Sequence, residues 1–187
     1  VAVLISHKAW QSSKKVLFIS PEMDKTEIAE RFYIFESGIS AKNVVQGTLT
    51  TAESEKYERE LNGSDKFKSI FVMDTSDNLT ASNIETAIRV TEPDLVIVDS
   101  IYMLPFKGGK TDRTIVAIDW IRQASKKHMI PFVGFHQMNR TTVKDKKFGG
   151  GYDTSNIALS DQLLWDAHAV FLLEQDDDLR VDAKMKI

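Results

Sequence analysis

Cysteine is absent from the 187 residues, which excludes disulfide bonds and metal sites built on thiolates. The chain also has no apolar run near the roughly 20 residues that a membrane-spanning helix requires, and its first residues form no signal sequence. The four histidines lack the spacing of a zinc-binding motif such as His-Glu-x-x-His. These absences argue against a zinc enzyme or a membrane protein and are compatible with a cytoplasmic protein.

The composition is that of a folded domain, with 42% hydrophobic and 27% charged residues. A length of 187 residues fits one domain that buries its own core. The formal net charge of -3 argues against a protein that coats nucleic acid with its whole surface. Any nucleic-acid binding must therefore be local.

Short apolar runs alternate with helical stretches along the chain. This pattern is typical of a mostly parallel sheet with helices on both faces, so the predicted fold class is α/β. The predicted strands are Lys15–Ser20, Ser69–Met73, Leu95–Asp99, Pro131–His136, Ala169–Leu173 and Leu179–Lys186. The predicted helices are residues 1–12, Asp24–Ser37, Thr51–Leu61, Thr80–Thr91, Thr111–His128 and Ala158–Ala167.

Polar residues follow three of the predicted strands, at the edge where an open parallel sheet binds its ligand. Asp99 ends an apolar strand, as in a Walker B segment, and could orient Mg²⁺ and its waters beside nucleotide phosphates. Glu22 could polarise an attacking water as a general base, or it could be an ordinary acid before a helix. Gln137 could contact a terminal phosphate, or it could be ordinary surface. Together these three residues favour a nucleotide site.

Three blocks of sequence carry a family resemblance, in the same order as in that family. VLFISPEM, PDLVIVDSIYML and ASKKHMIPFVGFHQMNR resemble successive segments of the hexameric replicative helicases of the DnaB type, including phage versions. The later stretch ALSDQLLWDAHAVFLL resembles the segment that leads into the next core strand. The resemblance implies a RecA-like ATPase core over residues 1–187 that uses ATP and Mg²⁺.

The resemblance also implies roles for individual residues. Glu22 is similar to the catalytic glutamate, Asp99 to the Walker B aspartate, and Gln137 to the phosphate-sensing glutamine. Lys184 and Lys186 resemble the lysine and arginine that reach into the ATP site of the neighbouring subunit. Because the family has arginine at the second position, either Lys186 replaces it or the equivalent is Arg180 or a residue beyond 187.

The family's Walker A loop, which is Gly-rich and ends in Gly-Lys-Ser/Thr, has no complete copy in the sequence. Gly109-Lys110-Thr111 has the ending without the earlier glycine, and Gly149-Gly150-Gly151 has no lysine after it. Residues 1–12 form a predicted helix without a capping residue ahead of it. We therefore expect a fragment whose Walker A loop precedes residue 1, and which binds ATP poorly and is inactive alone.

Two connections, Pro105–Arg113 and Arg140–Asn156, concentrate positive charge beside glycine and aromatic residues. A groove for single-stranded DNA has this composition. By position they resemble the two central-channel loops of RecA-like motors, although solvated surface loops have the same composition. The candidate DNA-binding residues are Lys107, Lys110, Arg113, Arg140, Lys144, Lys146 and Lys147.

The resemblance predicts an ATP-dependent DNA helicase that translocates on single-stranded DNA and unwinds duplexes in replication. It implies a homo-hexamer of the full-length protein, a primase or helicase loader as partner, and the cytoplasm of a bacterium or a phage-infected host. Two alternatives stay open. One is a RecA-type or KaiC-like recombinase ATPase, and the other is a RecA-like module that binds DNA or partners without hydrolysing ATP.

Overall fold

The sheet of this protein is parallel throughout the residues that the computed structural model describes, 1–62, 67–137, 166–171 and 173. Its strands are β1 (Val16–Ser20), β2 (Ile70–Asp74), β3 (Leu95–Asp99) and β4 (Phe132–Phe135). They are hydrogen-bonded in the order β2-β1-β3-β4, and Val16 pairs with both Ile70 and Leu95. All four strands therefore end at the same edge of the sheet.

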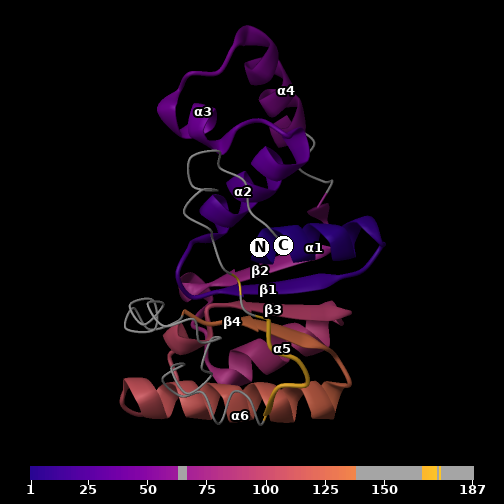
Figure 1. The fold of residues 1–187 in the computed structure, drawn as a ribbon. Coiled ribbons are helices and arrows are strands. Elements are labelled where there is room, and N and C mark those ends of the chain that lie inside the picture. Colours follow the sequence, from indigo (N-terminus) through magenta and orange to yellow (C-terminus); the bar gives the residue numbers. More distant parts are fainter. Residues whose placement is uncertain (63–66, 138–165, 172, 174–187) are drawn as a thin grey trace, which may run out of the picture.

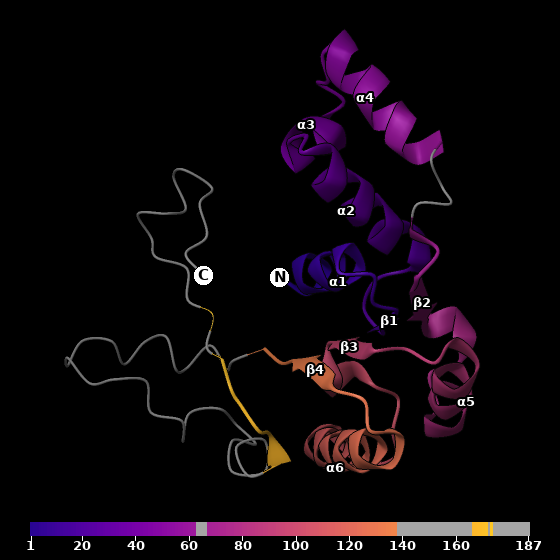
Figure 2. The same cartoon turned by 90° about the vertical axis from the view of Figure 1, so that its right-hand side faces the viewer.

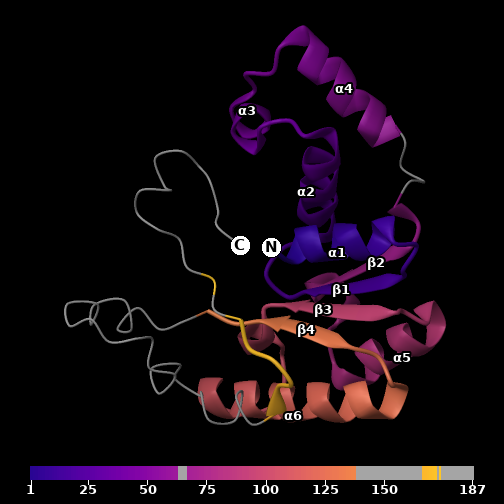
Figure 3. The same cartoon turned by 45° about the vertical axis from the view of Figure 1, so that its right-hand side comes forward.

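Helices cover both faces of the sheet, which confirms the predicted α/β class (Figure 1). One face carries α1 (Ala2–Gln11) and α2 (Lys25–Ser37), and the other carries α5 (Ala81–Thr91) and α6 (Lys110–His128). The helices α3 (Ala41–Gln46) and α4 (Thr51–Asn62) lie beyond the far end of α2, away from the sheet (Figure 2 and Figure 3). None of the helices within the described ranges combines the length and apolar character needed to cross a membrane.

Strand β1 is the centre of two hydrophobic cores, because its side chains alternate between the two faces of the sheet. Leu17 and Ile19 belong to the core beneath α5 and α6, and Phe18 belongs to the core beneath α1 and α2. All five residues of β1 are buried. Burial on both faces explains why this strand reads as a continuous apolar run rather than as an alternating one.

The start and end of α2 follow from local chemistry. The Asp24 carboxylate accepts the Glu27 N–H at 2.9 Å, and the Glu27 carboxylate accepts the Asp24 N–H at 3.2 Å. This capping box satisfies two N–H groups that a helix start leaves without a partner. Gly38 ends the helix in a left-handed conformation with φ of 66°.

The structure departs from the predicted elements in two places. Helix α3 was not predicted; its 6 residues are too few to repeat a helical period in the sequence. The prediction of a strand at Ala169–Leu173 is wrong for residues 169–171 and 173, which form no strand. Phe171 is 85% exposed, so its apolar character does not reflect pairing within the sheet. The strand predicted at Leu179–Lys186 lies outside the described residues, as does the Ala158–Ala167 helix except for 166 and 167.

Candidate active site

The structure brings three predicted site residues to the carboxyl edge of the sheet. Asp99 is the last residue of β3 and pairs in register with Phe135, the last residue of β4. Strand β3 lies between β1 and β4. Glu22 follows β1, and Gln137, which is exposed, follows β4. The predicted convergence at one edge is thus present for these residues.

The turn that carries Glu22 is built on a buried serine. Ser20, the last residue of β1, is fully buried. Its hydroxyl donates to the Met23 carbonyl oxygen at 2.7 Å and accepts the Met23 N–H at 3.1 Å. These two bonds close the turn between β1 and α2 and leave the Glu22 side chain exposed.

Asp99 lies in an environment that disfavours its charged form. Burial raises the pKa of Asp99 above its ordinary value, and the nearby charge of Glu22 raises it further. The guanidinium of Arg31 opposes this rise. A partly buried carboxylate beside a second carboxylate is typical of a site that binds a cation.

Arg31 was not identified from the sequence as a residue of the site. It lies on α2, is exposed, and has no ion-pair partner within the described part of the chain. Its charge nevertheless acts on Asp99, which comes from a distant part of the chain. No local pattern predicts this approach, because it depends on how α2 packs against the sheet.

The residues next to Asp99 are tightly packed. Ser100 is 3% exposed, and its hydroxyl has no hydrogen-bond partner within the described ranges. The peptide bond between Asp99 and Ser100 is cis. A Cβ atom at Gly134 of β4 would overlap the side chain of Ile101. Glycine at 134 thus lets the turn after Asp99 lie against β4.

A pocket of about 170 Å³ opens at this edge. Its wall consists of residues that follow β1, β2 and β3: Pro21, Thr75, Asn78, Leu79, Met103 and Pro105. Its lining is mainly apolar and contains neither Glu22 nor Asp99. The pocket therefore neighbours the carboxylates without including them.

The predicted DNA-binding residues fall into two groups. Lys107 is exposed in the connection that leads to α6. Lys110 and Arg113 lie in the first turn of α6 and not in the connection itself, and the Arg113 N–H donates to the Gly109 carbonyl oxygen at 2.8 Å. The others, Arg140, Lys144, Lys146 and Lys147, lie outside the described residues, as do Lys184 and Lys186.

Comparison with known proteins identifies relatives of this fold. The family described as "DnaB-like helicase C terminal domain" matches residues 1–186. The chain is similar to a solved structure of the ATPase domain of a phage protein, with a TM-score of 0.79 and 17% identity, covering 99% of this chain and 67% of that one. No curated protein matches the chain.

A second solved structure is "The Structure Of A DnaB-Like Replicative Helicase And Its Interactions With Primase", with a TM-score of 0.74 and 18% identity. The match covers 95% of this chain and 43% of that one, so the chain spans less than half the length of this relative. With the family match, these likenesses confirm the predicted RecA-like fold.

Replacing Asp99 by Asn is expected to stabilise the protein at neutral pH. Because the pKa of Asp99 is raised above 3.8, the folded state binds this proton more tightly than the unfolded state does. The charged carboxylate therefore lowers the free energy of unfolding at neutral pH, and this penalty disappears below pH 3.8. Thermal unfolding of both proteins in neutral and acid buffer measures the difference. A lower midpoint for Asp99→Asn at neutral pH would contradict this electrostatic description.

Proposed function

The chain belongs to the DnaB-like helicase C-terminal domain family, and on that premise we propose that it is the motor domain of an ATP-dependent replicative DNA helicase. The observation that carries the proposal is the partly buried Asp99 beside Glu22 at the carboxyl edge of a parallel sheet. In such sheets this edge is where nucleotides bind. The proposed activity is ATP hydrolysis coupled to translocation on single-stranded DNA and to duplex unwinding.

The available donors fit Mg²⁺ better than a metal held mainly by protein ligands. The described part of the chain has no group of three His, Cys, Asp or Glu side chains placed to hold an ion. Mg²⁺ requires few protein ligands, because it keeps several waters and takes further oxygens from phosphates. We assign Asp99 to orienting those waters. When bound, ATP would supply the phosphoryl group, and Mg²⁺ would neutralise part of the phosphate charge.

The other residues of the site would act on the attacking water or on the phosphates. Glu22 holds the attacking water and accepts its proton on a carboxylate oxygen, as a general base does. Gln137, at the same edge, contacts the terminal phosphate. Arg31 provides positive charge near Asp99, which suits contact with phosphate oxygens.

The proposal extends to partners of the full-length protein. Lys107, Lys110 and Arg113, together with the basic residues of 140–147, would contact single-stranded DNA through its phosphates. Lys184 and Lys186 would act in the ATP site of a neighbouring subunit in a homo-hexamer. A primase or a loader is a further partner, and the cytoplasm is the proposed location.

Replacing Glu22 by Gln tests the catalytic assignment in the full-length protein. Glutamine keeps the size of the side chain but cannot accept the proton, so ATP turnover should fall by at least about 100-fold while nucleotide binding is retained. Steady-state hydrolysis and equilibrium binding of a fluorescent ATP analogue measure the two effects. Unchanged turnover would remove Glu22 from the mechanism, and a wild-type protein without ATP hydrolysis would favour a binding module.

The DNA assignment predicts a change in salt dependence. Each lost phosphate contact should reduce the slope of log K against log salt by about 0.7 for single strands. The variant Lys107→Ala with Arg113→Ala should therefore bind oligonucleotides more weakly and with a shallower slope than the wild type. Lys126→Ala, at the opposite end of α6, is the matched control. Equal slopes in the two variants would exclude Lys107 and Arg113 from the DNA contact.

A further inference from the structure

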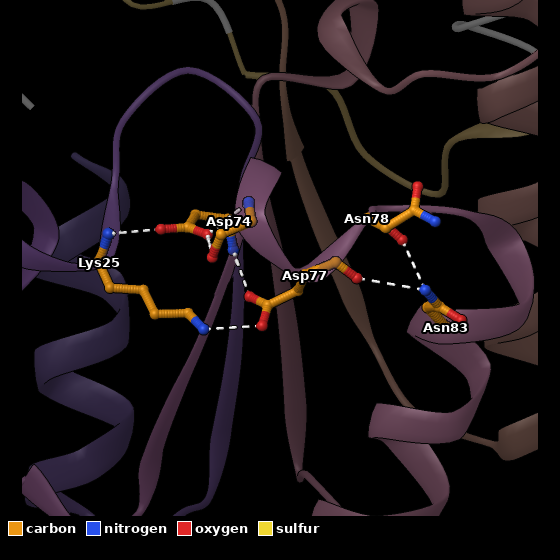
Figure 4. Close-up of polar contacts among 6 residues, drawn as sticks. Lys25, Asp74, Asp77, Asn78 and Asn83 are labelled. Carbon is orange, nitrogen blue, oxygen red and sulfur yellow. Dashed lines mark hydrogen bonds and ion pairs between the residues drawn. The ribbon is translucent and has the colours of Figure 1, made fainter.

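The Glu22 turn has a second support, from the neighbouring strand β2. Asp74, the last residue of β2, pairs in register with Ser20. Its carboxylate oxygen Oδ2 accepts the backbone N–H of Lys25, the first residue of α2, at 2.9 Å. Figure 4 shows this contact. The Ser20 hydroxyl thus holds the inside of the turn at Met23, and Asp74 holds the place where the turn enters α2.

Asp74 is itself held in a fixed orientation. It is 5% exposed, and its second oxygen, Oδ1, accepts the N–H of Ser76 at 2.8 Å and the Ser76 hydroxyl at 2.5 Å. The hydrogen bond from the Ser76 hydroxyl, followed by those from the backbone N–H groups of Lys25 and Ser76, holds the pKa of Asp74 below its ordinary value. Both carboxylate oxygens are therefore occupied as charged acceptors.

A second layer of contacts fixes the position of Asp74 (Figure 4). The Asp77 carboxylate accepts the Asp74 N–H at 2.9 Å and the Lys25 ammonium at 2.7 Å. The Asn83 amide donates to the carbonyl oxygens of Asp77 at 3.2 Å and Asn78 at 2.8 Å. The turn after β2 is thus tied to the starts of both α2 and α5.

We propose that Asp74 is a positioning residue for Glu22, acting through the Lys25 N–H. This inference rests on the proposed function, because it assumes that Glu22 acts on water. The Glu22 side chain is exposed, so the backbone of its turn determines where the carboxylate lies. A displacement of about 1 Å at a catalytic group can lower a rate by about 100-fold. Losing the hold at Lys25 should therefore reduce turnover.

The test is Asp74→Asn in the full-length protein. An asparagine has one acceptor oxygen and an NH2 group in place of the second, so it cannot accept the backbone N–H groups of both Lys25 and Ser76, although its size is unchanged. We expect the kcat for ATP hydrolysis to fall by about 10- to 100-fold, while the Kd of an ATP analogue changes less than about twofold. Ser20→Ala removes the inner hold and should have the same pattern, which keeps the test available if Asp74→Asn folds poorly.

Asp94→Asn is the matched control. The Asp94 carboxylate also accepts a backbone N–H, that of Lys15 at 2.8 Å, but it lies at the opposite end of the sheet, before β3 begins. This substitution alters a carboxylate that accepts a backbone N–H without touching the Glu22 turn, so kcat should stay at the wild-type value. An equal loss of kcat in both variants would indicate general destabilisation and would overturn the proposal.

Combining the substitutions separates this proposal from the proposed function. If Asp74 acts only through Glu22, the double variant with Glu22→Gln should hydrolyse ATP no more slowly than Glu22→Gln alone. A further loss in the double variant would overturn the positioning role. Wild-type kcat in Asp74→Asn, with Glu22→Gln inactive, would overturn the positioning role and leave the proposed function intact. Wild-type kcat in Glu22→Gln would contradict both.

Discussion

The complete burial of β1 between two parallel neighbours is the constraint on which the rest of the structure depends. Leu17 and Ile19 supply one hydrophobic core, Phe18 supplies the other, and none of the three is exposed. Parallel pairing with β2 and β3 then places the ends of all three strands at one edge. The last residues of these strands are polar: Ser20, Asp74 and Asp99. The active-site proposal follows from their position at one edge of the sheet.

Two carboxylates close together at this edge are electrostatically unfavourable, and in the proposed function a bound cation would relieve that repulsion. Asp99 is buried enough for its pKa to rise, and Glu22 adds like charge. Asp74 is the opposite case, because hydrogen bonds from Ser76 and Lys25 keep its pKa low. The two proposals assign different roles to these aspartates: Asp74, whose carboxylate is hydrogen-bonded, supports the Glu22 turn, and Asp99 acts toward the metal ion.

Local sequence was sufficient where a signal repeats over a few residues. The apolar run ending at Asp99 predicted β3 with its observed bounds, and Asp24 with Glu27 marked the start of α2. Sequence was insufficient where the signal depends on packing. Helix α3, with 6 residues, is too short to repeat a helical period. The approach of Arg31 to Asp99 and the bond from Lys25 to Asp74 join residues that only the fold brings together.

The most direct test of the central claim is an experimental structure of the full-length protein with Mg²⁺ and a non-hydrolysable ATP analogue. The account predicts that the terminal phosphate lies at the carboxyl edge of β1 and β3. Asp99 should hydrogen-bond a water on the metal, and Glu22 should hydrogen-bond a water next to the terminal phosphate. A nucleotide bound elsewhere, with Asp99 and Glu22 contacting neither metal-bound nor attacking water, would contradict the account.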